Sequence, residues 1–260
     1  MRHQRYVALG DSCAEGLDDP YPDGRGYRGF TDLTAERLAA LEPDLHYANL
    51  AVRGRRLDQI LAEQVPAALD LRPDLVTLFG GGNDVLQGRW HTDAARADLD
   101  AIVGALTEVA HTVVLFTLPD LARRLPGMSR RVRPRVTMLN NLIVATATRH
   151  RALLVDVRKD PSCEDIRLYG ADRLHLGELG HRRVAGHVLA ALDMPVDEWL
   201  APLPPAEREP YRDAAVRQWN WVRHHVWPAV HGTVRNKIVG RQPGDGLVPK
   251  RPDLVRLNPR

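Results

Sequence analysis

Cysteine, lysine and aromatic residues are all scarce in this sequence of 260 residues. Two cysteines, Cys13 and Cys163, are too few to frame a small secreted domain with disulfides. Long apolar runs are absent too, and none approaches the roughly 20 residues that a transmembrane helix needs. The residues before the apolar segment Tyr6–Leu9 leave no room for a signal peptide. We therefore expect a soluble, cytoplasmic protein without a membrane span.

The charged residues are distributed unevenly along the chain. It contains 36 Lys and Arg residues against 33 Asp and Glu residues, a net charge of +3. Residues 201–260 hold eleven of the basic and five of the acidic side chains, so the first 200 residues are slightly acidic. Only three of the basic residues are lysine, an excess of arginine that we interpret as coding bias. The body of the chain therefore gives no reason to expect a nucleic-acid partner.

Short apolar segments alternate with longer stretches of helical periodicity. The apolar segments show no polar alternation, as in strands that are buried on both faces of a parallel sheet. They are Tyr6–Leu9, Leu45–Leu50, Leu75–Phe79, Thr112–Thr117 and Ala152–Val157. The helical stretches are Gly29–Leu41, Leu57–Leu71, Ala94–Ala110, Arg135–His150 and about Glu178–Leu192. Five such units predict an α/β fold with a doubly wound, five-stranded parallel sheet flanked by helices.

The character of the chain changes after the last of these helices. A proline-rich linker is followed by a second helical stretch, expected from about Glu207 to Val226, and most of the tryptophans lie in this region. The end of the chain is rich in Pro, Gly and Arg, and we expect it to be irregular. We predict a main domain over residues 1–194 and a Trp- and Arg-rich helical extension with an irregular tail over 195–260. The tryptophans either dock a helix on the domain or cover its cleft.

Four short motifs occur at predicted strand ends or loops, where α/β folds gather their chemistry. A Gly-Asp-Ser tripeptide ending at Ser12 follows the first strand, and Gly54 comes after the second. Three glycines and then Asn83 follow the third strand, and Asp172 precedes His175 by three residues. Each motif alone fits an ordinary turn or helix cap. The information lies in their combination and order.

Together these motifs resemble those of the SGNH hydrolases, the GDSL-type esterases and lipases, over roughly residues 5–192. The resemblance implies a flavodoxin-like SGNH hydrolase fold and a serine esterase that uses no cofactor and no metal. It implies that Ser12 is the nucleophile, His175 the general base and Asp172 the residue that orients the base. The oxyanion hole would be formed by Ser12, Gly54 and Asn83.

Ester hydrolysis needs groups of these types. Ser12 would attack the acyl carbonyl while His175 takes its proton and returns it to the leaving alcohol. Asp172 would hold the imidazole in the required tautomer, and its spacing from His175 allows both to share one loop. The backbone N–H groups of Ser12 and Gly54 and the Asn83 amide would stabilise the oxyanion. The expected substrate is a small carboxylic ester, which is cleaved through an acyl-enzyme intermediate.

Two alternatives remain open. The same triad hydrolyses thioesters or removes acetyl groups from carbohydrates, and only a panel of substrates separates these activities. A non-enzymatic binding module would instead use the basic C-terminal tail against nucleic acid or an acidic partner. The acyl and alcohol groups of the substrate and the oligomeric state do not follow from the sequence.

Several neighbours of the motifs are expected to have structural roles. Asp11 and Asp84 would hold the loops of the motifs in register, and Cys13 would be a small buried hydrophobe rather than a thiol nucleophile. We expect His181 to be structural or on the surface. The irregular segment Glu15–Phe30 is expected to border the substrate cleft.

Overall fold

The central sheet is built mainly from the apolar segments of the sequence. The computed structural model describes residues 3–124, 129–205, 219, 221, 223–224 and 240–257. Its strands are β1 (Arg5–Gly10), β2 (His46–Asn49), β3 (Leu75–Phe79), β4 (Thr112–Phe116), β5 (Leu153–Val155) and β6 (Arg251–Arg256). The first five coincide with the five predicted segments and pair in parallel. This confirms the α/β fold with a parallel sheet.

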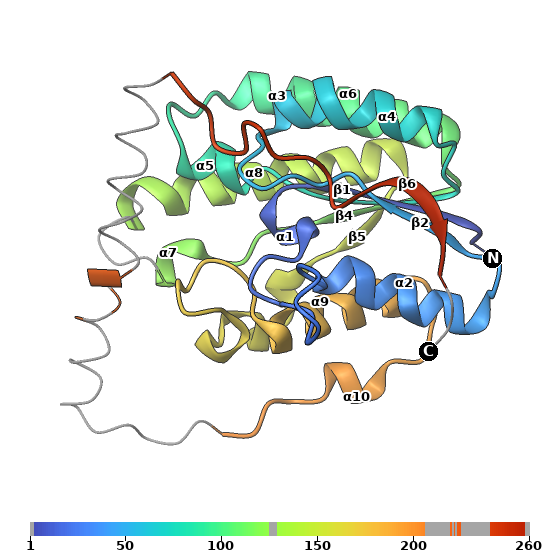
Figure 1. The fold of residues 1–260 in the computed structure, drawn as a ribbon. Coiled ribbons are helices and arrows are strands. Elements are labelled where there is room, and N and C mark those ends of the chain that lie inside the picture. The colour runs from blue at the N-terminus through green and yellow to red at the C-terminus, as the bar shows by residue number, and fades with distance from the viewer. Residues whose placement is uncertain are drawn as a thin grey trace.

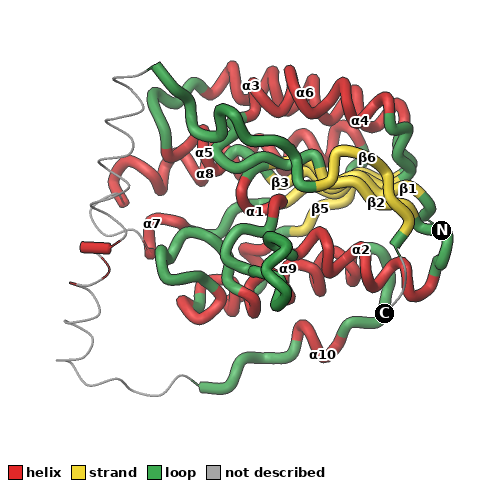
Figure 2. The backbone as a smooth tube through the Cα atoms, viewed as in Figure 1, coloured by secondary structure: helices red, strands yellow, loops and turns green. Residues whose placement is uncertain are grey.

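The order of the strands places the functional edge of the sheet. It is β5-β4-β3-β1-β2-β6, so the chain winds one way from β1 to β2 and the other way from β3 to β5. The loops that follow the neighbouring strands β1 and β3 therefore lead to opposite sides of the sheet. In α/β folds the change of winding direction opens a crevice at the carboxyl ends of such strands, where ligands bind. In Figures 1 and 2 the carboxyl ends of the strands face α1, α5 and α7.

Helices cover both faces of the sheet (Figure 1). They are α1 (Ser12–Glu15), α2 (Gly29–Leu41), α3 (Leu57–Gln59), α4 (Val65–Asp70), α5 (Gly82–Leu86), α6 (Thr92–Val109), α7 (Leu121–Arg124), α8 (Ser129–His150), α9 (Glu178–Ala191) and α10 (Asp197–Leu200). Helices α2 and α9 pack together on one face, and α4, α6 and α8 lie on the other. Apolar side chains of both helical layers and of the sheet form one core.

One predicted helix is interrupted, and the interruption serves the nucleophile loop. The stretch predicted as a continuous helix over 57–71 contains a π-helical turn, Ile60–Gln64, between α3 and α4. Gln64 lies at its end and is buried. Its amide accepts from the N–H of Gly10 and donates to the carbonyl of Gly10, both at 2.8 Å. The π turn thus aims one side chain at the end of β1, and such turns occur often at functional sites.

The end of the chain forms a sixth strand, which corrects the prediction of five strands and of an irregular tail there. Strand β6 runs antiparallel to β2 and pairs Tyr47 with Val255. Just before β6, the Lys250 ammonium lies 2.8 Å from Asp32 of α2. The sequence of β6 gave no signal because it is an exposed edge strand, which needs no apolar run and tolerates proline.

The remaining part of the extension is described only at separate positions. The stretch predicted as helical from about Glu207 to Val226 lies outside the described residues except at Trp219, Trp221, Arg223 and His224. Within the described segments, no helix combines the length and apolar composition that a membrane crossing requires.

Candidate active site

The turn from β1 into α1 presents Ser12 at the carboxyl edge of the sheet. Gly10 has a φ of 142°, and a side chain there would collide with the carbonyl of Phe79 on β3. The N–H of Asp11 donates to that same carbonyl at 3.2 Å. The Asp11 carboxylate caps α1 by accepting from the N–H of Cys13 at 3.1 Å. Ser12 is thereby held as the first residue of a helix that begins directly after a buried strand.

Ser12, His175 and Asp172 lie within hydrogen-bond distance of one another in series. The Ser12 hydroxyl is 3.0 Å from Nε2 of His175, and Nδ1 of His175 is 2.5 Å from the Asp172 carboxylate. The other oxygen of Asp172 accepts from the N–H groups of Leu174 and His175 at 2.9 and 3.0 Å. These backbone bonds fold the loop around the carboxylate, and Arg173 adopts a φ of 62° within it. The two residues predicted to share one loop do so, and the loop brings them to Ser12.

The surroundings of the imidazole favour its protonated form. Burial opposes the positive charge on His175, but the hydrogen bond that the imidazole donates to Asp172 and the negative charges of Asp172, Asp18 and Asp11 outweigh it. The pKa of His175 is therefore raised above its usual 6.5. Burial alone would raise the pKa of Asp172. The hydrogen bonds from His175 and from the two backbone N–H groups outweigh burial, so this pKa is lowered. The pair is thus set up to stabilise an imidazolium ion, which a general base becomes during catalysis.

Asn83 lies at the same edge, on the first turn of α5. Its amide donates to the Asp11 carboxylate at 3.2 Å and to the carbonyl of Arg55 at 3.0 Å. Its carbonyl oxygen accepts from Gln87 at 2.8 Å. Asn83 therefore links the loops that follow β1, β2 and β3, and both of its N–H groups have protein acceptors in this structure.

Gly54 follows β2, as predicted, and its surroundings include the C-terminal segment. It has a φ of 83°, and a Cβ at this position would lie 2.6 Å from the Pro243 side chain. Gly54 is not one of the described residues that line the cavity at Ser12. The sequence suggested glycine here so that an acyl group could approach the backbone. In the structure the group packed against Gly54 is Pro243.

Two buried carboxyl groups support these loops. Burial raises the pKa of Asp11 to about 6 in spite of the N–H of Cys13 and the nearby His175. Burial likewise raises the pKa of Asp84 to about 7. The Asp84 carboxylate accepts a hydrogen bond from the N–H of Leu57 at 3.1 Å, which lowers this pKa but does not outweigh burial. Asp11 also accepts from the Asn83 amide, so this contact and that of Asp84 with Leu57 each connect one loop of the site to another, in agreement with the holding roles expected from the sequence.

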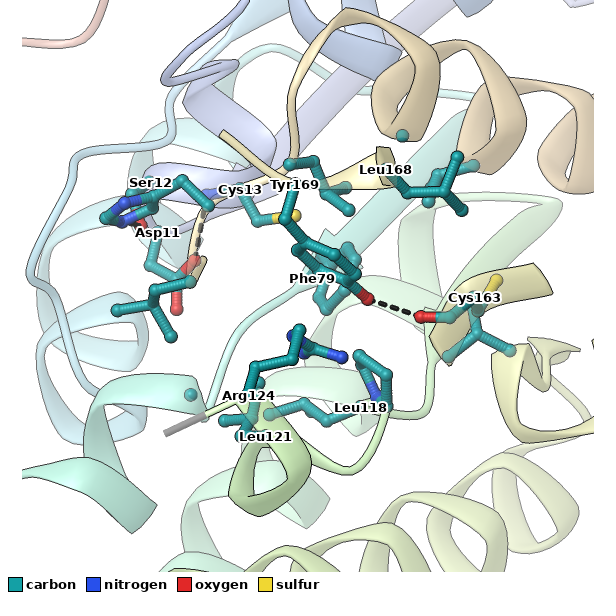
Figure 3. A pocket seen from close by; sticks show the side chains of 18 of the residues that line it. Asp11, Ser12, Cys13, Phe79, Leu118, Leu121, Arg124, Cys163, Leu168 and Tyr169 are labelled. Atoms are coloured by element: carbon teal, nitrogen blue, oxygen red, sulfur yellow. Dashed lines mark hydrogen bonds between the residues drawn. The ribbon is translucent and has the colours of Figure 1, made fainter. Parts of the chain in front are cut away.

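A mainly apolar cavity of about 90 Å³ adjoins the Ser12 hydroxyl (Figure 3). Asp11, Ser12, Asn83, His175 and Arg124 supply its principal polar groups. The other side chains of its wall are mostly apolar and include Phe79, Leu86, Leu118, Leu121, Val157, Leu168, Tyr169, Leu174, Leu176 and Val184. Apolar pockets with a few placed polar groups are typical of sites for small organic ligands.

Of the predicted structural residues near Ser12, His181 is buried and Cys13 is half-buried. Burial raises the pKa of the Cys13 thiol well above its usual value, so this thiol is not activated as a nucleophile. His181 accepts from the N–H of Phe30 at 3.1 Å and donates to the carbonyl of Leu17 at 3.0 Å. Burial lowers the pKa of His181 to about 4, so its ring is neutral. His181 thus ties the segment after the nucleophile to α9.

Two residues of the site were not identified as such from the sequence, which predicted for the tryptophans only that they dock on the domain or cover its cleft. The Trp221 indole N–H donates to the backbone carbonyl of Asp172 at 3.0 Å, so the extension contacts the loop of the base. Arg124, at the end of α7, is 5% exposed and lines the cavity. A single arginine is not informative in a sequence that holds so many, and the indole contact joins positions far apart in the chain.

Among the residues that the structure describes, two groups of side chains place potential metal ligands within 4.8 Å of one another. One, Asp18–Asp172–His175, overlaps the Ser12–His175–Asp172 series. The other is Asp160–Cys163–His187. The Asp160 carboxylate already forms a 2.5 Å ion pair with Arg183, and the charge of that guanidinium opposes binding of a cation.

Comparisons with known proteins show the family and the fold of the chain. A family model described as the GDSL-like lipase/acylhydrolase family matches residues 8–183. No curated protein matches the chain. An alpha/beta hydrolase enzyme from the metagenome of Lake Arreo, Spain, is similar in structure, with 23% identity, coverage of 73% of this chain and 95% of that chain, and a TM-score of 0.62.

Two further solved structures have the same fold. A lipase/acylhydrolase from Enterococcus faecalis shares 21% identity, with 79% of this chain and 100% of that chain covered and a TM-score of 0.58. An acetylxylan esterase from Geobacillus stearothermophilus shares 18% identity, with 77% of this chain and 97% of that chain covered and a TM-score of 0.59.

Proposed function

The chain belongs to the GDSL-like lipase/acylhydrolase family, and from this premise we propose that it is a serine esterase that cleaves carboxylic esters through an acyl-enzyme intermediate. Ser12 is the proposed nucleophile, His175 the general base and acid, and Asp172 the residue that orients His175. The observation that carries the proposal is the series of contacts from Ser12 to His175 at 3.0 Å and from His175 to Asp172 at 2.5 Å.

The reaction proceeds in two proton-balanced steps. His175 Nε2 takes the Ser12 proton as the hydroxyl attacks the acyl carbon, and then gives that proton to the leaving alcohol. Water next attacks the acyl-enzyme, loses its proton to His175, and the acid is released as Ser12 recovers its proton. Asp172 keeps the proton of Nδ1 directed toward itself and stabilises the imidazolium in both steps.

The oxyanion is proposed to bind the Ser12 backbone N–H, the Asn83 amide and the Gly54 N–H. Ser12 is the first residue of α1, so no carbonyl group of a preceding helical turn accepts a hydrogen bond from its N–H. Asn83 must share or exchange one of its present acceptors, and the longer of the two contacts, to Asp11 at 3.2 Å, is the one we propose to yield. Gly54 supports the proposal least, since Pro243 packs against it.

Two narrower activities share this machinery. The similar structures include acetyl xylan esterases and a protein named TesA, and the sequence left deacetylation of carbohydrates and thioester hydrolysis open. A cavity of about 90 Å³ favours a short acyl group in either case. The binding-module alternative has less support, because the basic groups of the tail include Lys250 and Arg256, which form ion pairs with Asp32 and Asp44 of the body.

The class and the nucleophile are tested together by a fluorophosphonate probe. The protein is treated with the probe and digested, and the labelled peptide is identified by mass spectrometry. We expect a single adduct on Ser12, formed faster than on the heat-denatured protein. Labelling at another residue, or none under conditions where the protein turns over a short ester, would contradict the proposal.

A further inference from the structure

We propose that the cavity beside Ser12 selects esters whose short acyl chain ends in a carboxylate, and that Arg124 binds this carboxylate. The inference rests on the proposed esterase function and names the substrate class for the same site. It begins from a buried cation in a mainly apolar wall.

Arg124 is buried without using its full capacity to donate hydrogen bonds. Its Nε donates to the carbonyl of Arg173 at 3.2 Å, and its guanidinium carbon lies 3.6 Å from the centroid of the Tyr169 ring. The two terminal nitrogens, Nη1 and Nη2, are buried and find no hydrogen-bond partner among the described residues. Figure 3 shows the side chain lying between the Tyr169 ring and the loop of Leu118 and Leu121.

Such an arrangement is unfavourable unless a ligand completes it. A guanidinium carries five N–H groups, stays charged at neutral pH, and is costly to bury without acceptors. Glu164 Oε2 lies 3.8 Å from Nη1, an ion-pair distance that is too long for a hydrogen bond, and this oxygen is likewise buried without a hydrogen-bond partner among the described residues. Its other oxygen accepts from the N–H of Asp120 at 3.0 Å. Glu164 therefore offsets part of the charge of Arg124 but leaves its terminal N–H groups available.

The shape of the site indicates what would satisfy Arg124. The terminal nitrogens of arginine match the two oxygens of a carboxylate, and the wall between Arg124 and Ser12 is apolar. The cavity of about 90 Å³ is smaller than the ~150 Å³ cavity that holds benzene, so it fits only a short acyl chain. A dicarboxylic half-ester with a two-carbon spacer has these features.

The charged end belongs to the acyl group rather than to the alcohol. The alcohol departs after the first step and is replaced by water, so its binding site must open to solvent. The acyl group stays attached to Ser12 through both steps and suits an enclosed cavity. An acyl carboxylate on Arg124 would also fix the position of the carbonyl against Ser12 and Asn83.

The test compares two esters of nearly equal shape. One is monomethyl succinate, and the other is methyl 4-methylpentanoate, in which an uncharged branched end replaces the carboxylate. The measured quantity is the ratio of kcat/KM for the charged ester to kcat/KM for the neutral ester. We expect a ratio above one for the wild type, and Arg124→Met should lower this ratio roughly ten- to hundredfold, the loss of one or two charge-assisted hydrogen bonds.

Arg123→Met is the matched control. Arg123 precedes Arg124 on α7, lies 3.9 Å from the same Glu164 oxygen and has a side chain that is 62% exposed. It does not occur among the described residues that line the cavity, so its loss should leave the ratio unchanged. An equal fall in both variants would mean that general surface charge, rather than Arg124, sets the preference.

A second variant keeps the test decisive if Arg124→Met does not fold. Glu164→Gln removes the carboxylate nearest to Arg124, retains an oxygen for the N–H of Asp120, and should raise the ratio severalfold. A third ester, of acetic acid with 3-hydroxypropanoate, carries the carboxylate on the alcohol. If Arg124→Met changes the preference only for this ester, the acyl assignment is wrong.

A wrong substrate class and a wrong esterase function would give different results. If the wild type hydrolyses the neutral ester and Arg124→Met leaves the ratio unchanged, the substrate class is wrong while the esterase function holds. If neither ester nor a short p-nitrophenyl ester is hydrolysed and the probe does not label Ser12, the esterase proposal itself is wrong.

Discussion

The two sides of the Ser12 hydroxyl are organised differently. On one side, His175 and Asp172 already form the contacts that proton transfer needs, at 3.0 and 2.5 Å. On the other side, the Asn83 amide donates to Asp11 and to the carbonyl of Arg55, and Pro243 packs against Gly54. The proposed base is therefore in place before substrate arrives, whereas one proposed oxyanion donor, the Asn83 amide, still donates to protein acceptors.

The origin of the difference is the distance along the chain. Asp172 and His175 share one loop whose own N–H groups fold it around the carboxylate, so the pair is assembled locally. Asn83 depends on Asp11 and on the loop after β2, which meet it only through the tertiary fold. Local assembly resists perturbation better than a junction of three loops, and this contrast orders the expected effects of substitution.

The largest effect is expected at the hydroxyl that both sides share. Ser12→Ala should lower kcat for a short p-nitrophenyl ester by roughly 10⁶, or to the background rate, because the nucleophile is lost. Cys13→Ala, at the adjacent residue, should cost less than tenfold, because burial keeps that thiol protonated. Far-UV circular dichroism checks that both variants fold. Activity that persists in Ser12→Ala would place the nucleophile elsewhere.

Asp172→Asn tests the preassembled side. Because the amide cannot stabilise the imidazolium or hold the same tautomer, kcat should fall by roughly 10³–10⁴. The pH profile adds a second readout. The raised pKa of His175 places the acidic fall in wild-type activity above pH 6.5, since only the neutral imidazole accepts the Ser12 proton. Loss of the Asp172 charge should move this fall to lower pH, and movement to higher pH would oppose the assigned role.

Asn83→Ala tests the junction on the other side. Removal of one oxyanion donor should lower kcat by roughly 10²–10³ with a smaller change in KM. Gln87→Ala serves as the control, because Gln87 donates to the Asn83 carbonyl oxygen from the far side and should change kcat by less than about tenfold. An Asn83 effect confined to KM would show that the residue binds substrate without stabilising the oxyanion.

Substitution of Gly54 is expected to have the smallest effect on the rate of hydrolysis. Its effect on the stability of the fold is expected to be clear. Gly54→Ala should lower the free energy of unfolding by about 2–4 kcal/mol, because a Cβ combines strain at positive φ with a clash against Pro243. Gly88→Ala isolates the strain, since Gly88 has a φ of 58° and open space around it, and should cost about 1–2 kcal/mol. Equal costs in denaturant unfolding would mean that the contact with Pro243 contributes nothing.

Much of the fold follows from local pattern, and the departures have physical causes. The apolar segments that became β1 to β5 are buried on both faces, so their composition alone marks them. Strand β6 escaped prediction because an exposed edge needs no such composition. The π turn that aims Gln64 at Gly10 depends on a partner more than fifty residues away, which a helical period cannot reveal.

The site divides in the same way. Ser12 and the Asp172–His175 spacing are visible in the sequence because they are short motifs at predicted strand ends or loops. The contact of Pro243 with Gly54 and the burial of Arg124 are properties of the assembled fold, since each joins segments whose separation no motif encodes. A sequence can therefore suggest which chemistry is present before it suggests which substrate is selected.

The coupling between hydroxyl and imidazole is tested most directly by the rate at which a fluorophosphonate modifies residue 12 in His175→Ala. If the imidazole removes the proton of that hydroxyl, the second-order rate at pH 7.5 should fall by at least roughly 10³ relative to wild type, in a variant whose circular dichroism is unchanged. A folded His175→Ala protein that is modified as fast as the wild type would show that the hydroxyl reacts without this base.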